Sequence, residues 1–518
     1  KIIKQGGSAI DTAIATGLCN GIANFQSMGI GGGHFLLYFN KTENKVYAIN
    51  ARERAPINSE LNMFKNQSSE EGGLASGIPG EIKGYWEAHK RWGKLDWKQL
   101  FEDAIDMCIN GFKLSKALAS AVKQYRTKVL NDEALRRVFI DPSTNLTHPE
   151  NTTIKMLHLG ETLRRISEDP ESFYSGELAS EIVEEMNAKG GNVTLEDFNS
   201  YSVVVNESEP VMLKDGMKVF TLPPPSSGLM ISFIMNVMKG FDFSPVNNKN
   251  VSNQTQLNIF YHRLIETFKH AYAKRTFLGD SEFVNVSKVV DELTSESHAN
   301  LIRKKIVDST TFPSTYYGTA AFKEDHGTAH ISILHPSGDA VGLTATINLF
   351  LGAKYAGVKT GIVYNNEMDD FSTPGKNNYF GFQASEANYI VPRKHPMSSM
   401  SPIIVTDSNN RAVLVVGASG GSKIISAVSQ VAIKTLWLNK SIVASIRERR
   451  VHHQLSPPEL EIEKGFSRLI TLQFSSFNHI EKSVNSFSFL LFLCFNNANG
   501  VACCLLVCSL KGGLPDGE

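Results

Sequence analysis

Five residues, Gly29-Ile30-Gly31-Gly32-Gly33, constrain the possible folds of this chain more than any other stretch. They follow an amphipathic helix predicted over residues 8–24, with Ser8 as its expected N-cap, and they precede an apolar strand at residues 35–39. A dinucleotide-binding glycine loop needs the opposite order, a strand and then a helix. We therefore predict that these glycines allow a close crossing of backbone segments inside a packed core.

Hydrophobic periodicity divides the rest of the chain into a helical part and a strand-rich part. Residues 100–200 are predicted to be mostly helical, with charges on solvated faces. Short apolar runs follow residue 328, at 330–334, 340–345 and 361–364, and glycine or proline turns separate them. The 518 residues therefore suit either about three domains or one large enzyme domain of mixed helices and strands.

The charge balance excludes one class of partner. Lysine plus arginine and aspartate plus glutamate number 52 each, so no net field draws the chain to nucleic acid or to anionic lipid. The sequence begins at Lys1, close to a predicted helix, and we expect any signal peptide or membrane anchor to lie upstream of it.

Ten Asn-x-Ser/Thr acceptor sites indicate a secreted or lumenal protein, because random occurrence would give only a few. The acceptors are Asn40, Asn66, Asn145, Asn151, Asn192, Asn206, Asn250, Asn253, Asn285 and Asn439. The six cysteines are less informative. Two interpretations of Cys19 stay open, a disulfide with a residue upstream of Lys1 and a buried free thiol. The cysteines between 494 and 508 lack the spacing of a zinc site.

The dipeptide Gly327-Thr328 is a candidate for self-cleavage. Gly327 has no side chain to shield its carbonyl, and the Thr328 hydroxyl can bend against that carbonyl. Cleavage would give Thr328 a free α-amine, which can act as the base for its own hydroxyl. Taken alone, however, the dipeptide favours a simple turn into the strand at 330–334.

Three further segments carry groups that can bind charged ligands. Arg52 follows a strand predicted at residues 46–50. Its guanidinium suits either a ligand carboxylate or a surface salt bridge with Glu53 or another acid. The acidic turn at 367–370 suits a solvated loop, a cation such as Ca²⁺, or a substrate ammonium. Residues 417–422 lie between a strand and a helix, where backbone N–H groups can bind an oxyanion or form a tight turn.

A helix predicted over residues 254–277 carries His262 and His270 on one face. No acidic residue is expected to adjoin them, so we interpret both as core or surface histidines and not as metal ligands. The polar stretch at residues 304–323 is predicted to be a mobile linker before the candidate cleavage point.

Together, nine segments resemble the gamma-glutamyltransferases, also called gamma-glutamyl transpeptidases or glutathione hydrolases. The resemblance extends over nearly the whole chain to about residue 475. The segments, in the order of that family, are Gly6–Asp11, Ser27–Gly33, Ala51–Glu53, Gly77–Gly80, Pro224–Gly228, Asp325–His330, Asn365–Phe371, Pro396–Met400 and Gly417–Gly421.

The resemblance implies an α+β fold of the N-terminal-nucleophile hydrolase class, an αββα sandwich of two stacked β-sheets flanked by helices. It also implies a single precursor that cuts itself between Gly327 and Thr328. Residues 1–327 would form the large subunit region and residues 328–518 the small, catalytic one, both within one αββα domain.

The resemblance further implies roles for individual residues. Thr328 matches the agent of cleavage and the mature nucleophile, Thr346 supports its hydroxyl, and the N–H groups of Gly420 and Gly421 form the oxyanion hole. The matching substrate ligands are Arg52, Ser398 and Ser399 for the α-carboxylate, and Asn348, Glu367 and Asp370 for the α-ammonium of the γ-glutamyl group.

The implied reaction is attack of Thr328 on the γ-amide of glutathione or of another γ-glutamyl compound. The resulting γ-glutamyl ester passes to water or to an acceptor amino acid or dipeptide. The resemblance implies neither a metal nor an organic cofactor. It also implies that contact with a membrane would come only from an anchor preceding residue 1.

One departure from the family pattern is the closing segment, and the other is the missing N-terminal segment, which in relatives supplies the first strand and usually a membrane anchor. Residues 476–510 diverge, because Cys508-Ser509-Leu510 stand before Lys511-Gly512-Gly513 where the family has Asp-x-Arg, and because the apolar run 487–495 has no recognised counterpart. This run is too short to span a bilayer. The main rival hypothesis is a catalytically silent, secreted homologue that acts as a binding or decoy protein, and a related acylase acting on other amides is a third.

Overall fold

The computed structural model describes residues 1–241, 253–318, 327–375, 384–484, 489–496 and 502–509. Residues 324–326 of the cleavage segment, the acceptor Asn250 and the terminal residues 511–513 lie outside these ranges.

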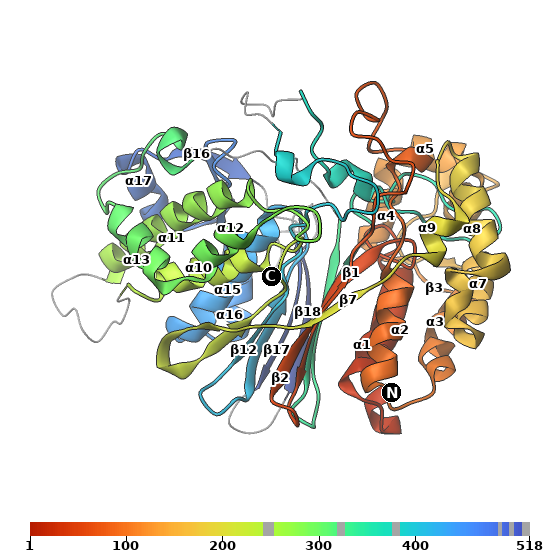
Figure 1. Cartoon of the computed structure of the whole chain (residues 1–518), viewed down its shortest axis with the longest axis horizontal. Helices are drawn as coiled ribbons and strands as arrows, with labels where there is room; N and C mark the ends of the chain where they lie inside the picture. The colour runs from red at the N-terminus through yellow and green to blue at the C-terminus, as the bar shows by residue number, and fades with distance from the viewer. Residues whose placement is uncertain (242–252, 319–326, 376–383, 485–488, 497–501, 510–518) are drawn as a thin grey trace. The chain divides into compact units, whose positions relative to one another are not determined.

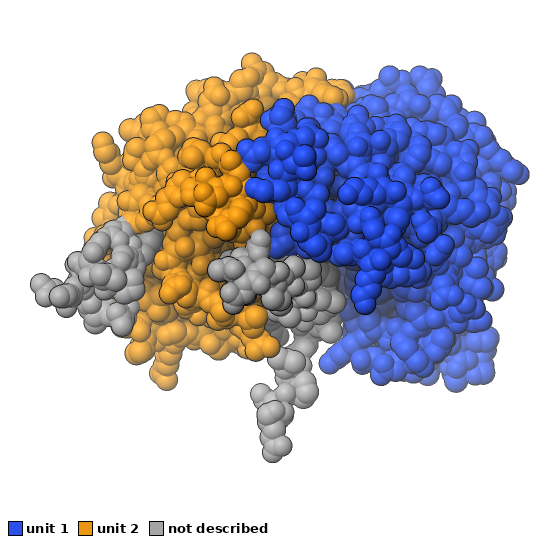
Figure 2. Space-filling view, turned by 90° about the horizontal axis from the view of Figure 1, so that it is seen from below, with its two compact units in different colours: residues 1–207, 325–373, 389–396 blue, residues 208–324, 374–388, 397–518 orange. Residues whose placement is uncertain are grey.

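The chain forms two compact units, each with its own hydrophobic core (Figure 2). Unit 1 contains residues 1–207, 325–373 and 389–396. Unit 2 contains residues 208–324, 374–388 and 397–518. Both units therefore include segments from either side of the predicted cleavage point.

Unit 1 contains a five-stranded antiparallel sheet, and Figure 1 labels its strands β1, β2 and β7. The strand order is β10-β11-β1-β2-β7. Its strands are β1 (Gly33–Asn40), β2 (Lys45–Ala51), β7 (Val204–Glu207), β10 (Ala329–Leu334) and β11 (Ala340–Thr346). The register pairs Phe35 with Thr344 and His330 with Thr344, so the strand after the candidate cleavage point lies beside β11.

Helices α1 (Ala9–Ala23) and α2 (Glu81–Trp92) pack against this sheet. As predicted, Ser8 caps α1. Its hydroxyl accepts from the Asp11 N–H while the Asp11 carboxylate accepts from the Ser8 N–H, which together form a capping box.

The remaining helices of unit 1 confirm that residues 100–200 are mostly helical. They are α3 (Glu102–Asn110), α4 (Lys116–Gln124), α5 (Arg126–Asn131), α6 (Glu133–Phe139), α7 (Leu157–Glu168), α8 (Gly176–Ala188) and α9 (Leu195–Asn199). Short two-residue strands join them: β3 (Phe112–Lys113), β4 (Ile140–Asp141), β5 (Leu146–Thr147) and β6 (Thr153–Ile154).

The glycine run crosses other backbone segments closely, as predicted. A Cβ atom on Gly31 would lie 2.1 Å from the carbonyl oxygen of Val363, and one on Gly32 would lie 2.0 Å from that of Thr346. Since no side chain fits at such distances, these positions require glycine. The run thereby brings the end of β11 and the segment before the acidic turn against the start of β1.

The prediction of a strand at residues 361–364 is wrong. Gly361 adopts a φ of 70° and its N–H donates to the Gly357 carbonyl, so the chain turns tightly there. Only an isolated bridge between Ala356 and Val363 remains of the expected pairing.

Unit 2 contains a six-stranded sheet in the order β18-β17-β13-β12-β9-β8. Its strands are β8 (Val211–Met212), β9 (Lys218–Phe220), β12 (Ile403–Thr406), β13 (Ala412–Gly417), β17 (Phe489–Asn496) and β18 (Ala502–Ser509). The apolar run without a family counterpart thus forms strand β17, whose backbone pairs with β13 and β18. A smaller sheet consists of β14 (Val451–His452), β15 (Glu459–Glu463) and β16 (Ile480–Val484).

Unit 2 also contains helices, and α11 is among the longest of the described chain. They are α10 (Gly228–Met238), α11 (Asn253–Arg275), α12 (Ser287–Thr294), α13 (Glu296–Lys305), α14 (Ser314–Tyr317), α15 (Lys423–Trp437), α16 (Ile442–Arg447) and α17 (Arg468–Ser476). No helix of the described residues has the length and apolar character needed to cross a membrane.

The described part of the predicted mobile linker is folded, which corrects that prediction. Helix α13 continues to Lys305, and α14 follows it. The Tyr317 ring is buried against α11, and its hydroxyl donates to Glu266 at 2.5 Å. The hydroxyls of Tyr317 and Thr311 therefore satisfy a buried carboxylate, whereas other polar residues of this stretch, such as Lys305 and Asp308, are exposed.

One buried acid in unit 1 gives a testable pH dependence. Glu81, at the start of α2, is fully buried, and burial raises the pKa of its carboxyl from 4.5 to about 8 although the Tyr85 hydroxyl donates to it. Between these pH values the unfolded chain loses a proton that the folded chain keeps, so the free energy of unfolding must fall as the pH rises.

We expect Glu81→Gln to remove this slope and to add roughly 3 kcal/mol to the free energy of unfolding at pH 7, relative to the wild type. Urea unfolding at several pH values measures the effect. Glu87→Gln is the control, because Glu87 lies on the same helix in ion pairs with Lys90 and Arg91. Parallel pH profiles for Glu81→Gln and the wild type would contradict this account of Glu81.

Candidate active site

Thr328 stands immediately before β10 in a strained conformation. Its side chain is 6% exposed, and its φ angle is 80°, a value that β-branched residues rarely adopt. Such a backbone stores about 1–3 kcal/mol of strain. The Thr328 N–H donates to the Ser27 carbonyl at 3.2 Å, which fixes the atom that cleavage would turn into an α-amine.

The residue before it can only be glycine. A Cβ atom on Gly327 would lie 1.8 Å from the carbonyl oxygen of Asn348. The Gly327-Thr328 bond is therefore held between a strained threonine and a close backbone contact, and the dipeptide is more than a simple turn into β10.

The hydroxyl of Thr346, at the end of β11, supports the Thr328 side chain. Thr328 Oγ1 donates to Thr346 Oγ1 at 3.1 Å, and Thr346 Oγ1 also accepts from the Asn348 N–H at 2.8 Å. The pairing of β10 with β11 positions the two threonines, so the contact follows from the register of the sheet.

We expect Thr346→Val to slow self-cleavage roughly tenfold, because it removes this hydroxyl while preserving the shape of the side chain. Pulse-labelling of expressing cells, with gels taken at successive times, measures the rate. Thr346→Ser keeps the hydroxyl and should process close to the wild-type rate. Equal rates for the valine and serine variants would show that the hydroxyl has no part in cleavage.

Asn348 presents a buried acceptor without a partner. Its Nδ2 donates to the Asn366 carbonyl at 3.1 Å, but its Oδ1 has no hydrogen-bond partner among the described residues. A buried acceptor left unpaired costs free energy, so its satisfaction by a ligand N–H would be favourable. This geometry suits the ammonium-binding role that the sequence predicts for Asn348.

Arg52 binds the acids of the turn that follows Asn366. Its Nη1 lies 2.9 Å from Glu367 Oε2 and 3.4 Å from Glu53 Oε2, and its Nη2 contacts Asp370 Oδ2. Arg52 is fully buried, so the predicted salt bridge with an acid is confirmed, but it lies in the interior and not on the surface. Residues predicted to bind opposite ends of a substrate thus bind one another in this structure.

Among the described residues, three carboxyl groups contact the single guanidinium of Arg52, so acidic groups outnumber basic ones there. Burial alone would lower the pKa of the Arg52 guanidinium, but Glu367, Glu53 and Asp370 together raise it. Burial also raises the pKa of the Glu53 carboxyl to about 7, although Arg52 opposes this shift. Three carboxyl groups around one guanidinium attract a further positive group, which favours binding of an ammonium here.

Asn365 is a positioning residue that the sequence analysis did not single out. Its Nδ2 donates to the carbonyls of Gly31 and Gly77, and its Oδ1 accepts from the N–H groups of Gly77 and Glu367. Asn365 therefore ties the acidic turn to the glycine run and to the turn before α2. The only signal in the sequence was the pair of asparagines, Asn365 and Asn366, before the acidic turn.

In unit 2, Ser398 and Ser399 lie in a loop held by the proline-rich turn at 223–228. The Ser398 N–H donates to the Pro225 carbonyl at 2.8 Å, and the Ser227 hydroxyl donates to the Ser398 carbonyl at 2.6 Å. Both serines are buried. The proline-rich turn therefore fixes the backbone that carries these two hydroxyls.

Arg275, at the end of α11, is the second positioning residue that the sequence analysis missed. Its Nε donates to Ser227 Oγ at 3.2 Å and its Nη2 donates to Ser399 Oγ at 3.1 Å. Arg275 thus joins the proline-rich turn to the predicted carboxylate ligand and adds a positive charge beside it.

Gly420 and Gly421 occupy the turn between β13 and α15, as predicted. Their φ angles are 113° and 60°, which favour glycine, and the Gly421 carbonyl accepts from the Ile424 N–H in the first turn of the helix. The Tyr272 hydroxyl donates a hydrogen bond to the Ser422 carbonyl and so stabilises this turn. A helix N-terminus with such a turn is suited to an oxyanion.

Known proteins resemble this chain along most of its length. The sequence model of the family described as Gamma-glutamyltranspeptidase matches residues 1–498. The chain is 41% identical over 493 residues to Scoloptoxin SSD14 of Scolopendra dehaani, covering 95% of this chain and 85% of that protein. It is 37% identical over 497 residues to Glutathione hydrolase proenzyme 1 of Schizosaccharomyces pombe, covering 92% and 76%.

A solved structure shows the same fold. The crystal structure of cephalosporin acylase from Bacillus halodurans superposes with a TM-score of 0.82 at 22% sequence identity, covering 96% of this chain and 89% of that one.

Proposed function

This chain is an enzyme of the gamma-glutamyltranspeptidase family with the N-terminal-nucleophile hydrolase fold, and we propose that it cuts itself before Thr328 and then cleaves γ-glutamyl amides. The proposed donors are glutathione and its conjugates. The observation that carries the proposal is the strained Gly327-Thr328 bond beside the Thr346 hydroxyl. The relative in Schizosaccharomyces pombe, named a proenzyme, supports self-processing.

The proposed cleavage begins at the strained bond. The Thr328 hydroxyl attacks the Gly327 carbonyl, an ester replaces the peptide bond, and water then hydrolyses the ester. This releases residues 1–327 with a new carboxylate and leaves Thr328 with a free α-amine. The backbone strain at Thr328 favours this step because it raises the energy of the uncut state.

In the mature enzyme, the Thr328 α-amine acts as the base for its own hydroxyl. The hydroxyl attacks the γ-amide carbonyl, the amine of the leaving group takes up a proton, and a γ-glutamyl ester forms on Thr328. Water, an amino acid or a dipeptide then resolves the ester. We propose that Gly420 and Gly421 stabilise the oxyanion in both steps.

The substrate's α-amino group is proposed to bind at Asn348, Glu367 and Asp370. The unpaired Asn348 Oδ1 and the acidic excess around Arg52 support this part of the proposal. Binding of the α-carboxylate by Arg52, Ser398 and Ser399 is a prediction from the family resemblance.

Arg275 offers a test of the carboxylate ligands. We expect Arg275→Met to raise KM for a γ-glutamyl donor roughly tenfold with a smaller change in kcat, because the Ser399 hydroxyl loses its donor and the site loses a positive charge. Steady-state kinetics with a γ-glutamyl anilide measures both constants. Arg263→Met is the control, since Arg263 lies on the same helix in an exposed pair with Asp308. An unchanged KM in Arg275→Met would argue against this role of Ser399.

An extracellular location is also proposed, on the strength of the acceptor asparagines. Seven of them are exposed: Asn66, Asn145, Asn151, Asn192, Asn206, Asn285 and Asn439. Asn40 is an exception, since its side chain is 8% exposed and its Nδ2 donates to Glu43.

The experiment that tests the proposed function is the incubation of purified protein with glutathione, with and without an acceptor dipeptide. The proposal predicts release of cysteinylglycine in both cases and a new γ-glutamyl peptide when the acceptor is present. A correctly folded, cut protein that releases neither product would instead favour the silent binding homologue.

A further inference from the structure

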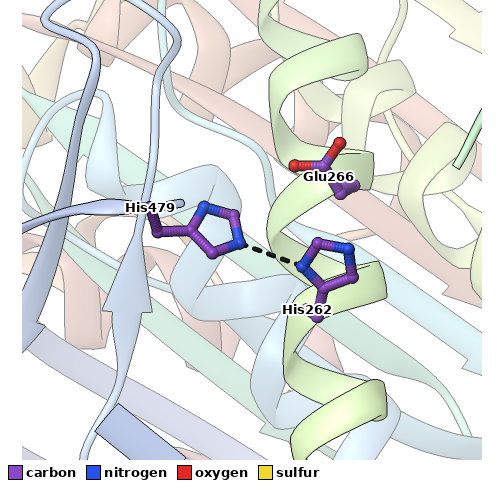
Figure 3. A group of neighbouring side chains, drawn as sticks. All are labelled: His262, Glu266 and His479. Carbon is purple, nitrogen blue, oxygen red and sulfur yellow. Dashed lines mark hydrogen bonds between the residues drawn. The ribbon is translucent and has the colours of Figure 1, made fainter. Parts of the chain in front are cut away.

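A buried group of side chains that can bind a metal lies in unit 2 and includes no residue of the candidate active site. Figure 3 shows His262 and Glu266 on α11, one helical turn apart, with His479 facing them from the segment before β16. All three side chains are buried. The expectation that no acid adjoins His262 is therefore wrong, whereas its placement in the core is confirmed.

The two imidazoles face each other across a hydrogen bond. His262 Nδ1 lies 3.0 Å from His479 Nε2, and one oxygen of Glu266 completes a group whose ligand atoms all lie within 4.8 Å of one another. Two nitrogens bound to one tetrahedral zinc ion lie about 3.3 Å apart, given zinc–nitrogen bonds of about 2.0–2.1 Å. The two nitrogens are thus close to the separation that a shared ion requires. An ion would replace the hydrogen bond between them, and the proton of His479 would move from Nε2 to Nδ1.

Surrounding groups orient the ligands. His262 Nε2 lies 2.9 Å from the Val307 carbonyl, which can only accept, so the proton is on Nε2 and Nδ1 presents its lone pair toward His479. Glu266 accepts from the hydroxyls of Thr311 at 2.6 Å and Tyr317 at 2.5 Å. Carbonyl and hydroxyl partners of this kind are typical of the shell around metal ligands.

We propose that His262, Glu266 and His479 form a binding site for a zinc-type divalent cation. Two imidazole nitrogens and one carboxylate oxygen are a donor set that zinc accepts, with a fourth position for water.

Lys269 is the competitor for this site. Its ammonium donates to Glu266 Oε1 at 2.9 Å and to His479 Nδ1 at 3.4 Å, so it is the cation beside the carboxylate in this structure. Entry of a divalent ion requires this ammonium to move away, and repulsion between the two cations weakens binding. The natural affinity is therefore lower than the three ligands alone would give.

A cavity beside the cluster provides room for this exchange. It has a volume of about 360 Å³, and both Lys269 and His479 line it together with His453 and Asn478. The Lys269 side chain can swing into this space, and a water ligand can reach the ion from it.

Cobalt(II) and zinc added to chelator-treated, full-length protein test the proposal. We expect one equivalent of cobalt with the visible spectrum of a tetrahedral ion, displaced by zinc, and a rise of Tm with zinc. His262→Ala and His479→Ala should each lose the spectrum, whereas His298→Ala, a histidine elsewhere in unit 2, should keep it.

Lys269→Met provides a second test that leaves all three ligands in place. It should bind zinc at least about tenfold more tightly than the wild type, because the competing charge is gone. Lys274→Met, on the same helix but paired with Glu292, should bind like the wild type. Absence of a cobalt spectrum in the wild type, or binding that survives both histidine substitutions, would overturn the proposal.

Discussion

Thr328→Ala is expected to remain a single uncut chain and to lose γ-glutamyl turnover by at least about 10⁴-fold. The substitution removes the hydroxyl that donates to Thr346 and attacks in both reactions. It also relieves crowding around the strained φ of 80°, so the uncut state becomes more stable. A denaturing gel and an assay with a γ-glutamyl anilide measure the two losses.

Two controls separate chemistry from folding. Thr328→Ser keeps a hydroxyl and should still cut itself and turn over substrate, though more slowly. Thr144→Ala changes an exposed threonine in a loop of unit 1 and should behave as the wild type. If Thr328→Ala is still cut before residue 328, an external protease performs the cleavage and the self-processing account is wrong.

Asp370→Asn is expected to lower kcat/KM for γ-glutamyl donors roughly 30- to 1,000-fold, mainly through KM, while leaving self-cleavage intact. The change removes a negative charge that would face the substrate ammonium, and it weakens one partner of the buried Arg52. Cleavage should persist because the contact between Thr328 and Thr346 does not involve Asp370.

The neighbouring Asp369 provides the matched control. Its carboxylate accepts from the Ser69 hydroxyl, and Asp369→Asn keeps an oxygen for that bond. We expect this variant to retain nearly wild-type kinetics. Loss of both cleavage and turnover in Asp370→Asn would indicate a structural role for Asp370, and unchanged kinetics would remove it from the substrate site.

The sequence predicted best those features that depend on neighbours along the chain. The cap of α1 by Ser8 needs only Asp11 three residues later, and strand β1 after the glycine run follows from a short continuous apolar run. The family resemblance added the fold, which the likeness to the cephalosporin acylase confirms. Each of these features is encoded within short segments, so a single sequence suffices to find it.

Contacts between distant segments could not be predicted in the same way. Arg52 was expected to bind Glu53 or an unspecified acid, and its partners Glu367 and Asp370 are more than 300 positions away. Similarly, nothing local to His262 indicates that His479 faces it from 217 residues further on. These pairs exist only because the fold brings the segments together.

Errors of element assignment also have physical causes. The run at 361–364 is apolar enough for a strand, but the positive φ of Gly361 turns the chain before a ladder can form. The stretch before residue 319 is polar enough for a linker, yet the hydroxyls of Thr311 and Tyr317 are used inside unit 2 to satisfy Glu266. In both cases the local composition gave the wrong secondary structure, because contacts with the rest of the fold determine the conformation of the segment.

The most direct test of the proposed N-terminal nucleophile is the mass and N-terminal sequence of the purified protein. The account predicts a fragment that begins Thr328-Ala329-His330, together with γ-glutamyl turnover that appears as this fragment forms. A cut at any other bond, or an uncut chain with full turnover, would contradict it, because Thr328 would then have no α-amine with which to activate its hydroxyl.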